Sequence, residues 1–181
     1  MTTQNDAAVL NAILNPMMPT DAAGGDKAIP DDAPIDHPNI EESKKTEVLG
    51  VKEAEAGNID KSVELFTQAI ELCPVNPSAY NNRAQSFRLQ NRNEDALKDL
   101  EEAIRLSNSN GKSGCQALVQ RALLHKRLGN DDAAREDFQT AADLGSSFAK
   151  MQLVALNPYA AMCNQMLAQV FNDLKEGKET K

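Results

Sequence analysis

Residues 76–109 read "NPSAYNNRAQSFRLQNRNEDALKDLEEAIRLSNS" and contain one complete copy of the pattern that governs the chain. Two stretches with helical spacing of apolar residues flank Asn91, a residue type that tolerates the left-handed conformation in which helices end. Small side chains recur where two such helices would approach each other, and Leu100 stands where the space between them must be filled. The stretch therefore predicts a pair of antiparallel helices.

The same pattern occurs on both sides of this stretch, so the chain contains an internal repeat. Gly57, Asn91 and Gly129 recur 34 and then 38 positions apart. The extra four residues fall in the polar segment "SNSNGKSG" (107–114), which we expect to be a loop. Small and large residues align at the same offsets in four sets: Gly50, Ala84 and Ala122; Ser62, Ala96 and Ala134; Phe66, Leu100 and Phe138; and Ala69, Ala103 and Ala141.

The repeat divides the chain into three parts. Residues 1–42 form an N-terminal arm, with an amphipathic helix at 6–14 and then a flexible, acidic, Pro-rich tether that cannot bury enough apolar surface to order itself. Residues 148–181 hold two apolar helical stretches, which we expect to cap the third repeat because a solenoid exposes an apolar end. The three repeats, within residues 43–147, occupy 43–75, 76–109 and 114–147.

The spacing of these positions resembles that of the tetratricopeptide repeat, with Ser-x3-Phe-x2-Ala followed by Pro74 in the first copy and Ala-x3-Leu-x2-Ala in the second. The resemblance implies an all-α fold, a right-handed superhelical solenoid of three helix pairs with C-terminal capping helices. From "AVLNAILNP" to "LVALNPYAAMCNQMLAQ" the chain is also similar to a family of small three-repeat proteins described as binding the seventy-kilodalton heat-shock chaperone. That similarity implies a cytoplasmic adaptor of co-chaperone type, with the nucleus as the alternative location.

Composition argues against several classes of function. The net charge of -8, the sequence pI near 4.8 and the lack of a basic run argue against nucleic-acid binding, which needs clustered Lys and Arg. No long apolar run and no cationic leader occur, so we expect neither a membrane span nor a secretory signal. Three cysteines without short spacings, Cys73, Cys115 and Cys163, indicate reduced thiols that are buried or half-buried.

Catalytic chemistry finds no support in the sequence, and we expect no enzyme, no cofactor and no metal site. The segment "NGKSG" (110–114) is similar to the end of a phosphate-binding loop, but it lacks the preceding glycine and the strand that such a loop requires. His37 and His125 have no ligands at metal spacing and no paired nucleophile, so we interpret them as surface and helix-face residues. Arg83 and Arg121 occupy equivalent positions, and we expect their guanidinium groups to pair with nearby acids.

A peptide-binding groove is the remaining candidate site. In the tetratricopeptide domains that hold chaperone tails, Lys, Asn and Arg residues on the first, third and fifth helices grip the terminal carboxylate. The corresponding positions here are Glu47, Val51, Asn82, Gln116 and Gln120, of which only Asn82 matches. The sequence therefore predicts an incomplete clamp, in which Asn82 either lines the groove or is bonded within the solenoid.

The expected groove is rich in amides with a mild positive bias, so it would suit an extended acidic peptide. The tether around Asp31, Asp32 and Asp36 is such a peptide, and it could occupy the groove in cis and compete with partners. A second hypothesis is a structural subunit whose end helices join a larger assembly or a homo-oligomer; we expect a monomer, which favours the adaptor. The predicted groove residues are Asn81, Asn82, Gln85, Arg88, Gln116, Gln120, Lys126 and Arg127.

Overall fold

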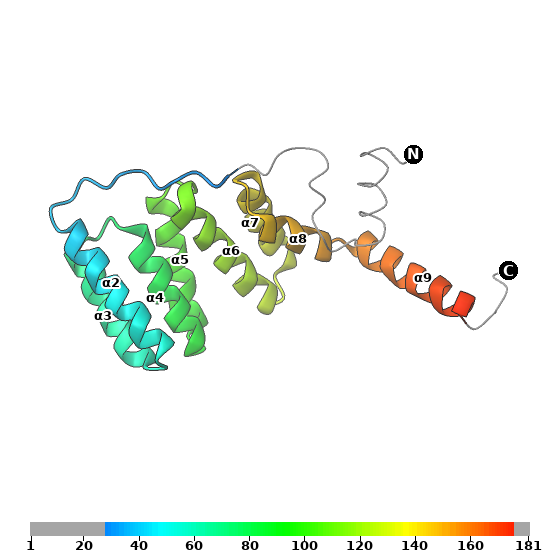
Figure 1. Cartoon of the computed structure of the whole chain (residues 1–181), viewed down its shortest axis with the longest axis horizontal. Helices are drawn as coiled ribbons and strands as arrows, with labels where there is room; N and C mark the ends of the chain where they lie inside the picture. The colour runs from blue at the N-terminus through cyan, green and yellow to red at the C-terminus, as the bar shows by residue number, and fades with distance from the viewer. Residues whose placement is uncertain (1–27, 176–181) are drawn as a thin grey trace, which may run out of the picture. The chain divides into compact units, whose positions relative to one another are not determined.

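Figure 1 shows the computed structural model, which describes residues 28–175 as eight α-helices with no strand. Residues 28–146 belong to one compact unit and residues 147–175 to another. The expected all-α fold is confirmed, whereas the helix predicted at 6–14 lies outside the described residues. The helices are α2 (Ile40–Glu55), α3 (Ile59–Leu72), α4 (Pro77–Leu89), α5 (Asn93–Leu106), α6 (Gly111–Arg127), α7 (Asp131–Asp143), α8 (Ser147–Ala155) and α9 (Pro158–Lys175).

Three helix pairs make up the first unit: α2 with α3, α4 with α5, and α6 with α7. The pairs pack in chain order, and the first helices of neighbouring pairs also contact one another, α2 with α4 and α4 with α6. Such an arrangement is a solenoid in which each pair buries its apolar face against the next. The first helices therefore form one continuous surface along residues 40–127.

The turn within each pair has the conformation that the repeat predicts. Gly57, Asn91 and Gly129 all have positive φ, at 85°, 60° and 80°. In the second pair the N–H of Asn91 donates to Arg88 O, and the N–H of Arg92 to Phe87 O, and the same two bonds recur in the other two pairs. These bonds satisfy the last carbonyl groups of the first helix in each pair. The turn therefore ends that helix and directs the chain into the second helix of the pair.

Small and large side chains alternate in the core as the aligned positions predict. Phe66, Leu100 and Phe138 are 2%, 0% and 0% exposed, and the small residues around them are also buried. Gly50 shows why one of these positions is so small, because a Cβ atom there would lie 2.6 Å from Cε1 of the Phe66 ring. The helices of the first pair therefore approach each other closely only because this side chain is absent.

Two arginine pairs tie the helices of the second and third repeats together. Arg83 donates from Nε and Nη2 to Asp99 at 2.7 and 2.8 Å, and Arg121 donates to Asp137 in the same bidentate way at 2.8 and 2.7 Å. Both carboxylates are 6% exposed. The predicted pairing of these arginines is thereby confirmed, and the bidentate geometry offsets the cost of burying the charges.

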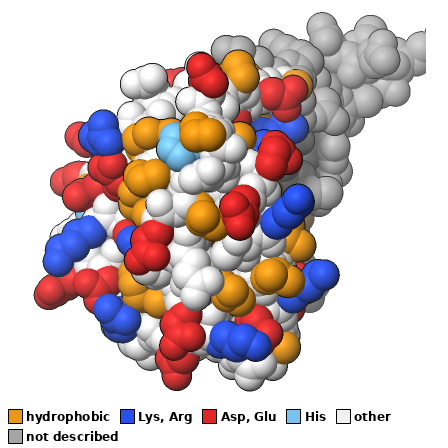
Figure 2. All heavy atoms as spheres, turned by 90° about the vertical axis from the view of Figure 1, so that its left-hand side faces the viewer, with side chains coloured by type: hydrophobic (Ala, Val, Ile, Leu, Met, Phe, Trp, Pro, Cys, Tyr) orange, Lys and Arg blue, Asp and Glu red, His pale blue; other side chains and the backbone are white. Residues whose placement is uncertain are grey.

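The first repeat lacks this ion pair and carries Leu49 at the position equivalent to Arg83. This end of the solenoid faces the viewer in Figure 2, where apolar side chains lie between acidic and basic ones. Val48 and Leu49 on α2 are 54% and 52% exposed. Scattered apolar residues of this kind are common on protein surfaces.

Residues 28–39 run as an extended strap beside the helix ends, drawn in blue in Figure 1. Asp32 accepts hydrogen bonds from the backbone N–H of Ser113 (2.8 Å, to Oδ1) and from the Ser113 hydroxyl (2.7 Å, to Oδ2), and Asp31 pairs with Lys112 Nζ at 2.6 Å. The sequence predicts a flexible tether here, and in the structure these residues are fastened at Asp31 and Asp32 to the start of α6. They lack a core of their own, but the start of α6 supplies the partners that order them.

The strap also explains where α6 begins. The sequence predicts that "SNSNGKSG" is a loop, but the helix starts inside this segment at Gly111, which has a φ of 71°. Asn110 Oδ1 accepts from the Gly111 N–H at 2.9 Å, while Asp32 accepts from the N–H two residues further on. Because these oxygens satisfy amide groups that would otherwise be unpaired, the helix gains a turn that local spacing does not predict.

The second unit contains α8 and α9, which contact one another. Asn157 Oδ1 accepts from the Tyr159 N–H at 3.0 Å, which starts α9 after Pro158 has ended the preceding helix. The predicted packing of these helices on the third repeat stays a prediction.

No helix within residues 28–175 is long and apolar enough to cross a bilayer. One stripe of α9 is exposed, with Tyr159, Met162, Met166, Leu167, Val170 and Phe171 between 42% and 73% accessible.

Candidate partner-binding surface

The first helices of the repeats carry all eight residues predicted to line the groove. Four lie on α4 and four on α6, two helices that contact each other. Hydrogen bonds join at least six of the eight, either to one another or to neighbouring residues. We call the surface formed by these residues the inner face: Asn81, Asn82, Gln85, Arg88, Gln116, Gln120, Lys126 and Arg127.

A network of amides occupies the middle of the inner face. Asn81, which is only 2% exposed, donates from Nδ2 to Gln116 Oε1 at 3.2 Å and accepts from Gln120 Nε2 at 2.8 Å. The free oxygen of Gln120 in turn accepts from Arg88 Nη1 at 3.3 Å. The two glutamines at the positions of the clamp cations are therefore bonded across α4 and α6, and they hold the helices in register.

Glu47 lies at the centre of a second network, between α2 and the start of α4. Its Oε1 accepts from Asn76 Nδ2 at 2.5 Å, and its Oε2 accepts from the Ser78 hydroxyl at 2.7 Å and from Asn82 Nδ2 at 3.0 Å. The side chain is 6% exposed, and this burial raises the pKa of Glu47, while the three donated bonds lower it. The carboxyl group is thus a structural acceptor, held by three neighbours.

Asn82 is bonded within the solenoid, which is one of the two roles its position allows. Its amide N–H group is directed at Glu47, so the one residue that matches the clamp pattern already serves an internal acceptor. Glu47 is itself a buried acceptor and not an open surface charge. Sequence reasoning missed Asn76 and Ser78, although the "NPS" start of α4 is a recognisable helix cap.

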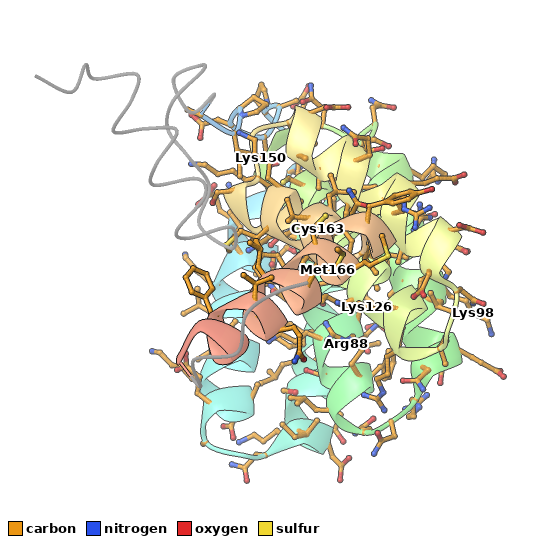
Figure 3. All side chains as sticks on the ribbon, turned by 90° about the vertical axis from the view of Figure 1, so that its right-hand side faces the viewer. Arg88, Lys98, Lys126, Lys150, Cys163 and Met166 are labelled. Carbon is orange, nitrogen blue, oxygen red and sulfur yellow. The ribbon has the colours of Figure 1, made fainter. Side chains whose placement is uncertain are left out.

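The far end of the inner face carries two arginines without a carboxylate partner among the described side chains. Arg88 is half-buried, and Arg127 donates from Nη2 to Asn91 Oδ1 at 2.7 Å. Burial and the nearby charge of Arg127 lower the pKa of Arg88. Gln85, Lys126 and Arg127 are exposed. Figure 3 labels Arg88 on α4 and Lys126 on α6.

The acidic strap does not reach these arginines. Two of its three acids, Asp31 and Asp32, bind Lys112 and Ser113 at the start of α6. The strap and the helix ends border an open cavity of about 800 Å³ lined by Ile35, Val75 and Leu106 among others. In the structure Asp31 and Asp32 therefore contact the "NGKSG" segment and not the inner face, while the hypothesis that the N-terminal arm occupies the groove in cis stays a prediction.

The cysteines and histidines are the remaining residues that could carry chemistry. Cys73 and Cys115 are buried as expected, and burial raises the pKa of Cys115, but Cys163 on α9 is exposed, so that prediction was wrong. His37 Nδ1 accepts from the Asn39 N–H at 3.3 Å, and His125 lies half-buried on α6. Within the described part of the chain, no group of three or more His, Cys, Asp or Glu residues is placed to hold a metal ion.

Two models of the tetratricopeptide repeat match the chain, at residues 49–111 and 116–144. Among curated proteins, tetratricopeptide repeat protein 36 of Caenorhabditis briggsae is 55% identical, covering 98% of this chain and 99% of the relative. The Homo sapiens protein of the same name is 47% identical, covering 100% of both chains.

Solved structures also share the helical arrangement. The second tetratricopeptide domain of Spaghetti (RPAP3), bound to the HSP90 peptide SRMEEVD, is 25% identical with a TM-score of 0.53, covering 59% of this chain and 94% of that one. The tetratricopeptide domain of Arabidopsis OM64 is 26% identical with a TM-score of 0.58, covering 66% and 97%. The repeats found in the sequence thus have counterparts at the level of fold.

Proposed function

This chain belongs to the tetratricopeptide repeat protein 36 family, and we propose that it is a non-catalytic adaptor of co-chaperone type whose inner face binds an extended segment of a chaperone. The seventy-kilodalton heat-shock chaperone is our candidate partner, from the resemblance of the sequence, and the cytoplasm our candidate location. The likeness to a domain bound to an HSP90 peptide supports a chaperone as the class of partner.

We propose further that this binding does not use a complete carboxylate clamp. The main support for this proposal is that residues at the clamp positions already have hydrogen-bond partners within the protein. Asn82 donates to the buried Glu47, while Gln116 and Gln120 are bonded to Asn81. A terminal carboxylate at these positions meets neutral amides and an acid in place of cations. It would forfeit the charge-assisted hydrogen bonds that provide most of a clamp's affinity.

The test compares the full-length seventy-kilodalton chaperone with a form that lacks its C-terminal tail. We expect this protein to bind both forms with similar affinity in calorimetry, because the contact does not depend on a terminal carboxylate. A companion measurement uses the peptide SRMEEVD as the free acid and as the C-terminal amide, which should bind equally weakly. Loss of binding on tail removal, together with a clear preference for the free acid, would show that a clamp operates.

A structural subunit is the second candidate function, and the exposed stripe of α9 favours it. Tyr159, Met166 and Phe171 are 73%, 62% and 60% exposed on one helix. Large apolar side chains that gather along a helix are typical of a surface that packs against another helix. In this alternative the protein would join a larger assembly, or a second copy of itself, through its end helices.

A further inference from the structure

Half-buried arginines in this solenoid fall into two groups that differ in their partners. The side chains of Arg83 and Arg121 are 18% and 24% exposed, and each binds an aspartate through two hydrogen bonds. Arg88 is also half-buried, but it forms no ion pair with an Asp or Glu in the described residues. A guanidinium that has lost part of its hydration without gaining a carboxylate is unusual, because unpaired charge is costly to bury.

The surroundings of Arg88 increase this cost. It donates a hydrogen bond to the neutral oxygen of Gln120 at 3.3 Å, and the charge that acts on it is the like charge of Arg127. The pKa of Arg83 and of Arg121 is raised, first by the hydrogen bonds that they donate to their aspartates, whereas burial lowers the pKa of Arg88. The geometry and the direction of these shifts agree that Arg88 lacks an anion.

Two features of the fold hold the arginines together despite their repulsion. Arg88 and Arg127 lie in the last turns of α4 and α6, where the partial negative charge of the helix end favours cations. Asn91, in the left-handed turn after α4, accepts from Arg127 Nη2 at 2.7 Å and ties this side chain to the end of α4. The helix ends account for the presence of cations but not for the half-burial of Arg88.

We infer that Arg88 and Arg127 form an anion site on the inner face that takes the carboxylate of an Asp or Glu side chain from an extended acidic segment of a partner protein. A planar guanidinium binds such a carboxylate through two parallel hydrogen bonds, and the second arginine adds charge. Gln120 and Asn91 orient the two side chains. The site lies beyond the clamp positions on both helices, so it recognises acidic side chains and not the end of a chain.

The overall charge of the protein narrows the class of ligand. A chain with a net charge of -8 repels long polyanions such as nucleic acids, whose affinity depends on many phosphate contacts. A single carboxylate within a peptide needs only the local field of the two arginines, while the amides of the inner face can bond the peptide backbone. An acidic protein segment therefore suits the site better than a polyanion.

The inference rests on the proposed use of the inner face, and its test needs no chaperone. A short, fluorescently labelled peptide of alternating Glu and Asp, blocked at both ends, is titrated with the full chain at low salt, beside a Gln and Asn counterpart. We expect preference for the acidic peptide, and about tenfold weaker binding after Arg88→Gln or Arg127→Gln. Arg105→Gln is the matched control, because Arg105 is exposed on α5 and pairs with Glu102.

Thermal unfolding separates a ligand site from a structural role. We expect Arg88→Gln to keep or raise the melting temperature, because the substitution removes an unpaired buried charge, whereas Arg83→Gln should lower it by leaving Asp99 unpaired. Equal binding of the acidic and neutral peptides by the wild type, or unchanged binding by both inner-face variants, would overturn the inference. If the peptide measurements fail in this way while the wild type still binds the chaperone, the anion site is wrong and the adaptor function stands.

Discussion

At the scale of single residues, the protein satisfies most of its buried polar groups through partners far away in sequence. Glu47 receives hydrogen bonds from Asn76, Ser78 and Asn82, at sequence separations of 29 to 35 residues. Arg83 reaches Asp99 across its repeat. These bonds make α2, α4 and α5 depend on one another, since removing one partner leaves a buried group unsatisfied.

Glu47→Gln should change how stability depends on pH. Because burial raises the pKa of Glu47, the folded state binds this proton more tightly than the unfolded chain. The contribution of Glu47 is therefore fully present below the ordinary glutamate pKa, and it is lost as the pH rises through the raised value. We expect the free energy of unfolding of the wild type, relative to that of the variant, to fall by on the order of 1 kcal/mol across this window.

Chemical denaturation at several pH values measures this difference. Glu55→Gln, at an exposed position in the same helix, is the control and should show a smaller change. Titration of the other carboxylates cancels between the wild type and each variant, because both contain them. If the stability difference for Glu47→Gln were constant across the window, the carboxyl group would not carry a raised pKa.

At the scale of elements, helix starts are assembled from more than one segment. Two side-chain oxygens accept from the backbone N–H groups of the first turn of α6. One belongs to Asn110, directly before the helix, and the other to Asp32 in the strap, 81 positions away from Ser113. Gly111 is required where it stands, because its φ is 71° and an added Cβ would collide with Asp32. Strap and helix thus order each other.

Asp32→Ala should release the strap and weaken α6. The variant loses both hydrogen bonds to Ser113 and a negative charge at a helix N-terminus, which together stabilise such a helix by roughly 1 kcal/mol. We expect faster amide hydrogen exchange in residues 28–36 and at the start of α6, with a small fall in melting temperature. Asp36→Ala, in the same segment, is the control, and equal exchange in both variants would contradict a specific anchor.

At the scale of the whole molecule, each of the two compact units carries a different candidate surface for partners. The inner face is polar and joined by hydrogen bonds, whereas the exposed stripe of α9 is apolar. The first suits an extended peptide and the second a helix, so the two candidate functions use separate parts of the chain.

Sedimentation measurements over a wide range of protein concentration decide between these functions. We expect a mass of 19.7 kDa throughout, because a stripe on one helix buries less than the roughly 1,200 Å² typical of stable complexes. The double variant Met166→Glu and Phe171→Glu should sediment identically. A wild-type mass that rises with concentration, and that these two changes return to the monomer value, would favour the structural subunit.

The structural features that the sequence determined by itself are either local or repeated from one helix pair to the next. The left-handed turns at Gly57, Asn91 and Gly129 and the alternation of small and large core residues depend on neighbours within one or two helices, so the repeat period reveals them. The same holds for the two arginine pairs, because equivalent positions in successive repeats meet equivalent partners. The predicted groove residues were chosen in the same way, and the structure places them on the first helices of the second and third pairs.

The tertiary structure alone decided which polar groups find partners and which do not. Sequence spacing cannot show that Glu47 is buried, that Asp32 crosses to Ser113, or that Arg88 has no acid within the described residues. Each outcome depends on segments distant in sequence meeting at one point, where desolvation and hydrogen bonding compete. The periodic pattern thus predicts the scaffold, and the long-range contacts determine the chemistry of its surface.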